Sequence, residues 1–216
     1  MEGRRYEYHE RATDSQGRII NPGSWTDEEI DEKVKDILKN AKVSPYSVPK
    51  DGELPKPYFL QNLIEQYDFF RRNINEPKRI FYPCCELDIS PLKGFPNSEI
   101  VLMDKEPTLE TIMKQEGITQ YIQGDVLTYI PENPFDLVIA LNPALSSEDL
   151  TKYLVNGGHV LANNWHNNAS QLLEDSSFEG LGTIDKNAHG IYLAKGDFSK
   201  LEPHQFPNYL YVFRKL

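Results

Sequence analysis

The chain has 216 residues, of which 39% are hydrophobic and 26% are charged. This composition is ordinary for a folded globular protein and excludes wholesale disorder. No apolar run approaches the roughly 18 residues that would span a bilayer, and the basic residues at the start are not followed by the apolar segment of a secretory signal.

The net charge of −10 disfavours contact with phosphate backbones and argues against nucleic acid as a partner. The two cysteines, Cys84 and Cys85, are adjacent, which disfavours a structural disulfide between them. We therefore expect a reduced, cytoplasmic protein that does not associate with membranes.

The first 75 residues predict an arm and a two-helix cap. Residues 1–23 are polar, and Thr26 and Glu29 then form a capping box before an apolar stripe at helical spacing. Four prolines make residues 43–57 an extended connector. A second amphipathic helix follows over residues 59–74.

From residue 76 onward, short apolar runs alternate with helical segments. The predicted strands are Arg79–Tyr82, Glu99–Asp104, Gln120–Gln123, Asp136–Leu141 and His159–Asn163. The predicted helices between them are Thr108–Gln115 and Glu148–Val155, the second capped by Ser146 or Ser147 and closed by Gly157 and Gly158. This order predicts an α/β fold, with a mostly parallel sheet and helices on both faces. The last apolar runs have no helix between them, which predicts an antiparallel strand pair.

Ligands of open parallel sheets bind beyond the carboxyl ends of the strands. The residues at these positions are Pro83–Asp88, Asp104, Asp125, Asn142-Pro143 and 163–168. The order of these motifs resembles that of the class I S-adenosylmethionine-dependent methyltransferases over residues 78–216. That resemblance implies a Rossmann-like fold and S-adenosylmethionine as the cofactor.

The glycine-rich turn of that family, VLDLGCGTG, corresponds here to residues 80–88. Cys84, Glu86 and Asp88 stand in place of its three glycines, and Tyr82 replaces the acidic residue of the first strand. Asp104 matches the acidic residue that holds the ribose hydroxyls. Asp125 matches the acidic position near the adenine. The resemblance implies that cofactor contacts come from these positions: Tyr82, Cys84, Glu86, Asp88, Asp104 and Asp125.

The altered turn also helps to rank cofactors. Glu86 and Asp88 would oppose the pyrophosphate of a dinucleotide but favour the ammonium and sulfonium of S-adenosylmethionine. A nicotinamide oxidoreductase is therefore a weaker hypothesis. An alternative role for the two carboxylates is structural, with Asp88 or Ser90 capping a short helix that begins at Pro91. Asp104 and Asp125 have the same alternative, as caps of the turns that follow them.

Two candidate catalytic residues follow the fourth and fifth strands. Asn142-Pro143 is similar to half of the N-P-P-[YFW] motif of methyltransferases that act on amino nitrogens, and otherwise is a turn that ends a strand. His166 could act as a general base, and Trp165 beside it could stack on a ring. The alternative is a plain loop in which Asn167 or Asn168 caps a helix over Ala169–Leu173.

The cysteines predict no metal site, because the chain has no second cysteine pair and no histidine at ligand spacing. Two functions compete. The first is a methyltransferase acting on a small molecule or a protein, with the helical cap covering its pocket. The second is a methyltransferase-like domain that has lost catalysis and serves as a binding or scaffold module.

Overall fold

The computed structural model describes residues 56–141, 143–201 and 209–216, which belong to one compact unit over Lys56–Leu216. The predicted arm and the first predicted helix lie outside the described residues, as does Asn142. The second predicted helix is α3 (Gln61–Asn73). Among the described residues, no helix is long and apolar enough to cross a membrane.

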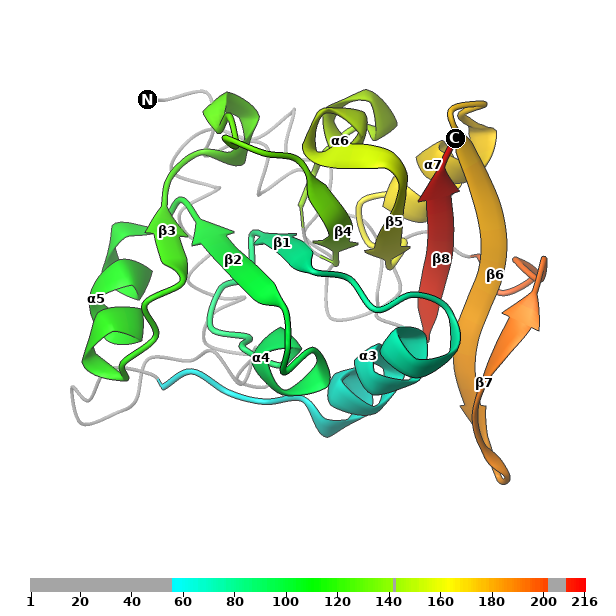
Figure 1. The fold of residues 1–216 in the computed structure, drawn as a ribbon, viewed down its shortest axis with the longest axis horizontal. Helices are drawn as coiled ribbons and strands as arrows, with labels where there is room; N and C mark the ends of the chain where they lie inside the picture. Colours follow the sequence, from blue (N-terminus) through cyan, green and yellow to red (C-terminus); the bar gives the residue numbers. More distant parts are fainter. Residues whose placement is uncertain (1–55, 142, 202–208) are drawn as a thin grey trace, which may run out of the picture. The chain divides into compact units, whose positions relative to one another are not determined.

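An eight-stranded sheet forms the centre of this unit, in the order β3-β2-β1-β4-β5-β8-β6-β7 (Figure 1). The first five strands in the chain are parallel to one another, as predicted. They are β1 (Arg79–Pro83), β2 (Glu99–Asp104), β3 (Tyr121–Gln123), β4 (Phe135–Ala140) and β5 (Leu154–Ala162).

The other end of the sheet is antiparallel, as the sequence predicts. β6 (Phe178–Asn187) and β7 (Gly190–Lys195) form a hairpin, and β8 (Leu210–Lys215) lies between β5 and β6. β8 pairs antiparallel with both of these neighbours. The last two strands of the chain therefore do not pair with each other, because β8 returns past the hairpin to the edge of β5.

Two buried clusters cover the two faces of the sheet, which confirms the predicted layers. The strands alternate between them: Ile80 and Tyr82 join one cluster, and Phe81 joins the other. The first cluster includes side chains of α3 and α5 (Pro107–Gln115), and the second includes those of α6 (Ser147–Tyr153) and α7 (Asn168–Glu174). The remaining short elements are α4 (Pro91–Gly94) and the 3₁₀ turn η2 (Val126–Thr128).

Local sequence explains the start of α6. Ser146 Oγ accepts a hydrogen bond from the Asp149 N–H (3.1 Å), and Asp149 Oδ2 accepts one from the Ser146 N–H (3.2 Å). This capping box satisfies two N–H groups that have no partner within the helix. Of the two predicted caps, Ser146 is the one at the N-cap.

The end of α6 differs from the prediction. Gly157 and Gly158 do not close the helix but lie inside β5, which begins directly after Tyr153. Gly157 has a φ of 77°, and the register between β4 and β5 shifts beside this segment. A β-carbon on Gly158 would lie 2.9 Å from the Val155 carbonyl oxygen. The glycines thus serve an irregular strand start rather than a helix end.

Candidate cofactor site

The topological switch point lies between β1 and β4. From β1 the chain moves outward to β2 and β3, and it then returns to β4 on the other side of β1. Loops leaving the carboxyl ends of β1 and β4 therefore run in opposite directions, which is where open α/β sheets bind ligands. The loop after β1 is the segment 84–90, and it contains the three residues that replace the family glycines.

The backbone of this loop is left-handed at two of the three replaced positions. Cys84 has a φ of 52° and Glu86 a φ of 51°. A residue with a β-carbon pays about 1–2 kcal/mol for this conformation, which glycine adopts freely. The loop therefore keeps the backbone shape for which glycine is suited, although no glycine is present.

Asp104, at the end of β2, holds this loop against the sheet. Its Oδ2 accepts a hydrogen bond from the Glu86 N–H, and its Oδ1 accepts one from the Glu106 N–H, both at 3.1 Å. The Cys85 N–H also donates to the Met103 carbonyl oxygen (3.2 Å). A carboxylate has about four acceptor positions, so Asp104 keeps capacity for further donors.

Asp88 is buried in a network of neutral donors. The Tyr82 hydroxyl donates to its Oδ2 (3.1 Å), and the Ser90 N–H (2.8 Å) and hydroxyl donate to its Oδ1. The Ser90 hydroxyl in turn accepts from the Leu60 N–H (2.7 Å), just before α3 begins. Burial raises the pKa of Asp88 above its ordinary value, although these hydrogen bonds lower it. Ser90 occupies the N-cap position of α4, with Pro91 in the first turn.

Glu86 is a half-buried carboxyl in a negative environment. Burial raises its pKa, and the nearby carboxylates of Asp104 and Asp88 raise it further. Among the described residues, no hydrogen bond or ion pair of its side chain is present. The neighbouring thiols are not activated, because burial raises the pKa of Cys84 to about 12 and that of Cys85 well above its usual range. Within the described part of the chain, no group of three or more His, Cys, Asp or Glu side chains could hold a metal ion.

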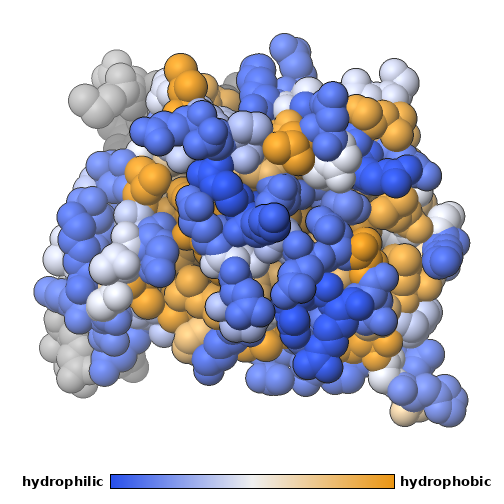
Figure 2. Space-filling model, in the orientation of Figure 1, coloured by the Kyte–Doolittle hydropathy of each residue, from blue (hydrophilic) through white to orange (hydrophobic). Residues whose placement is uncertain are grey.

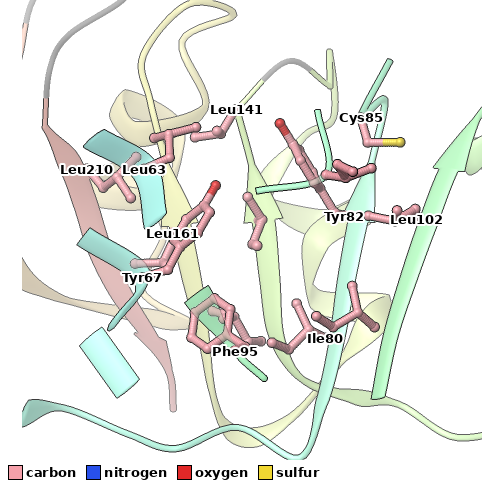
Figure 3. Close-up of a cluster of buried hydrophobic side chains, with 14 of the residues drawn as sticks. Leu63, Tyr67, Ile80, Tyr82, Cys85, Phe95, Leu102, Leu141, Leu161 and Leu210 are labelled. Carbon is pink, nitrogen blue, oxygen red and sulfur yellow. The ribbon is translucent and has the colours of Figure 1, made fainter. Parts of the chain in front are cut away.

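Tyr67 in α3 is a polar residue that the sequence analysis did not single out. Its side chain is fully buried, and its hydroxyl has no hydrogen-bond partner among the described residues. Figure 3 shows the hydroxyls of Tyr67 and Tyr82 pointing toward the end of the sheet at which Cys85 and Leu141 lie. Burial raises the pKa of Tyr67 well above its ordinary value, and the charge of Asp88 adds to the effect. In the sequence, Tyr67 lies at helical spacing from apolar neighbours, and this pattern predicts only a core residue.

Asp125 follows β3, and the loop with Trp165 and His166 follows β5, so these residues also lie beyond the carboxyl ends of strands. Asp125 Oδ1 accepts a hydrogen bond from the Leu127 N–H (3.0 Å) at the start of η2. Trp165 and His166 are half-buried with their rings edge to face, 6.4 Å apart. The backbone N–H of Trp165 donates to Asn163 Oδ1 (3.1 Å).

The start of α7 differs from the expected cap. Asn167 is at the N-cap position with a φ of 60°, but its side chain makes no capping hydrogen bond. Asn168 instead donates from Nδ2 to the Leu145 carbonyl oxygen (2.9 Å). The Ser170 N–H is satisfied by Asn164 Oδ1 (3.0 Å), so the capping oxygen comes from a residue further back in the loop.

No protein-family model matches the sequence, and no curated protein sequence matches it. Solved structures do match the fold. The N-methyltransferase NodS from Bradyrhizobium japonicum WM9, in complex with S-adenosyl-L-homocysteine, is similar with a TM-score of 0.52 and 12% identity, over 85% of this chain and 97% of that one. The cofactor-bound Rv0187 from MTB is similar with a TM-score of 0.51 and 11% identity, over 86% and 95% of the two chains. The chain thus has the Rossmann-like fold of the class I S-adenosylmethionine-dependent methyltransferases.

Proposed function

We propose that this protein binds S-adenosylmethionine at the carboxyl ends of β1–β4 and transfers its methyl group to a small molecule or a protein. The observation that carries the proposal is the left-handed backbone at Cys84 and Glu86. Strained backbone conformations persist where surrounding contacts impose them, and they cluster at ligand sites. Here the surrounding contact is the carboxylate of Asp104.

The residues present fit the chemistry of this cofactor. S-adenosylmethionine offers hydrogen-bond donors in its ribose hydroxyls, adenine amino group and ammonium, and the strand ends offer carboxylates. We assign Asp104 to the ribose, Asp125 to the adenine, and Glu86 and Asp88 to the amino-acid end. The buried Tyr67 hydroxyl, which has no partner in the described part of the protein, is a further polar group available on this side of the sheet.

When bound, the cofactor supplies a methyl group activated by the positive sulfur. Methyl transfer is an in-line displacement, so the protein contributes mainly by positioning. We assign Asn142 and His166 to the acceptor, which they would orient or deprotonate. The acidic charge of the chain favours acceptors other than nucleic acid.

Thermal unfolding with and without ligands tests the proposal. A ligand at one hundred times its Kd stabilises by about 2.7 kcal/mol, which should raise the midpoint by about 5–10 °C in a domain of this size. We expect this shift with S-adenosylmethionine and S-adenosylhomocysteine but not with NAD. The absence of a shift with both adenosyl compounds would contradict the proposal.

A second candidate function is a binding or scaffold module without catalysis. It is favoured by the Glu86 side chain, which stands where the family has no side chain, and by Asp88, whose carboxylate already accepts three hydrogen bonds from the protein. Under this alternative the wild type binds neither adenosyl compound, and Glu86→Gly is the first variant in which binding would be regained.

A further inference from the structure

The loop after β1 and the end of β2 carry negative charge that the described protein does not neutralise. Among the described residues, the Glu86 carboxylate has no ion-pair or hydrogen-bond partner, and Asp88 is held by a tyrosine, a serine hydroxyl and a backbone N–H, all of them neutral. Asp104 is likewise bound by backbone N–H groups. Lys105 follows directly in the sequence, but no ion pair joins it to these carboxylates in the described part of the chain.

The hydroxyl of Tyr67, which has no partner among the described residues, is a second sign of a ligand at the carboxyl ends of the strands. The hydroxyl is buried, and this burial and the charge of Asp88 raise its pKa. It points toward the carboxyl ends of the strands (Figure 3). A buried hydroxyl without a partner costs about 1–3 kcal/mol, so such groups call for an explanation. A bound molecule that supplies a hydrogen bond removes this cost.

We infer that the site selects positively charged ligands, with Glu86 setting the preference. This inference rests on the proposed function and makes it more specific: the protein binds S-adenosylmethionine more tightly than S-adenosylhomocysteine. During transfer, a lone pair of the acceptor bonds to the methyl carbon, and the electron pair of the broken carbon–sulfur bond stays on sulfur. The sulfur thereby loses its positive charge, and the attraction to Glu86 and Asp88 weakens.

The comparison of these two ligands isolates the effect of charge. Both carry the same adenosine, ammonium and carboxylate, so their other contacts cancel, and they differ by one methyl group and one charge. A half-buried carboxylate is screened less by solvent than an exposed one, so its attraction to a cation within a few ångströms is large. Preference for the charged ligand would also speed exchange of product for substrate.

Isothermal titration calorimetry of the full chain with both ligands tests the inference. We expect the wild type to bind S-adenosylmethionine at least about tenfold more tightly, a factor that corresponds to 1.4 kcal/mol. Glu86→Gln should bring the two affinities close together. Glu116→Gln is the matched control, because Glu116 is an exposed residue with the same charge. It directly follows the last residue of α5, on the way to the start of β3 rather than at the carboxyl end of a strand. This control should leave the ratio unchanged.

Each contrary result has a distinct meaning. Equal affinities in the wild type would overturn the inference and leave the proposed function intact, whereas no binding of either ligand would overturn both. An unchanged ratio in Glu86→Gln would overturn the role of that residue. Tyr67→Phe should weaken binding of both ligands while raising the unfolding midpoint of the free protein. Unchanged affinities in this variant would remove Tyr67 from the site.

Discussion

Cys84 and Glu86 hold a backbone shape that their side chains disfavour. Each pays about 1–2 kcal/mol for a left-handed φ, and Glu86 also places a carboxyl beside Asp104 and Asp88. The contacts of Asp104 and Met103 with the loop backbone keep this shape in place. The loop is therefore organised before any ligand arrives, at the expense of stability.

Two substitutions at Glu86 should separate strain from charge. The folded-state pKa of Glu86 is raised above its unfolded value, so the folded protein favours the neutral carboxyl. The stability that the neutral Glu86 gives the folded state is fully present below pH 4.5 and is lost as the pH rises through the folded pKa, because the ionised carboxylate is disfavoured in the folded protein. Glu86→Gln should thus stabilise the protein at pH 7 but not at pH 4. Glu86→Gly should add a gain of up to about 1 kcal/mol at both pH values, because it also relieves the backbone. Urea unfolding at the two pH values measures both, and identical effects of the two variants would contradict the strain argument.

His159 should make the protein sensitive to mild acid. Its side chain is buried against Phe70, its Nδ1 has no partner within residues 56–141, 143–201 and 209–216, and burial and the charge of Arg214 lower its pKa. The unfolded chain therefore takes up a proton near pH 6.5 before the folded chain does, and stability falls as the pH drops below that value. His159→Gln should lose less stability than the wild type between pH 7.5 and pH 5.5, as followed by the thermal midpoint. A parallel loss in both proteins would refute this assignment.

The sequence predicted the places of the assigned residues unevenly. Its strand pattern located Asp104 at the end of β2 and Asp125 shortly after β3, because residues at the carboxyl ends of parallel strands lie at the same end of the sheet. Tyr67 was not predicted, since its spacing in α3 is that of an ordinary core residue and only the three-dimensional packing leaves its hydroxyl without a partner among the described residues. The φ values of Cys84 and Glu86 contradict residue preference, so no local rule predicts them.

Among the elements, β6 depends on one glycine. Gly182 has a φ of 136°, and a β-carbon there would lie 2.2 Å from the Ala194 carbonyl oxygen in β7. Gly182→Ala must push apart the hairpin, and we expect it to cost about 3 kcal/mol or more. Gly117→Ala is the control, because it has a φ of 76° but open space around it, and it should cost about 1 kcal/mol. Equal losses in chemical denaturation would show that crowding at β7 is unimportant.

Periodicity predicted most elements but not how distant ones pair. The apolar runs located β1, β2, β4 and β5 because strands covered on both faces have few polar positions, and the short run over Gln120–Gln123 located the edge strand β3. The Gly157-Gly158 pair was assigned to a helix end, since an irregular strand start has the same local signature. The insertion of β8 between β5 and β6 is a contact between segments far apart in the chain, and nothing in a local pattern specifies it.

At the scale of the whole molecule, the described residues form one compact unit over Lys56–Leu216. Its sheet has a buried cluster on each face. We expect a fragment spanning residues 56–216 to fold and to unfold in one cooperative transition. Far-ultraviolet circular dichroism and the fluorescence of Trp165 should give coincident curves, and separate transitions would show that the unit is not self-sufficient.

The surface of this unit is mixed in character. Apolar and hydrophilic residues are interspersed over the face in Figure 2. The exposed large apolar residues are spread over several segments of the unit: Phe59, Leu60, Ile122, Leu127, Ile130, Leu173, Tyr192 and Leu216. Isolated exposed apolar residues are normal on a folded protein and specify no partner.

The position of β8 has a consequence for the order in which the chain folds. β6 and β7 can close their hairpin from local contacts, but β6 reaches the parallel strands only through β8, which comes later in the sequence. Joining the two parts must wait for a strand that closes long loops with both neighbours, and such contacts form slowly. The hairpin thus spends the early stages of folding as a separate piece, with the edge of β6 open until β8 docks.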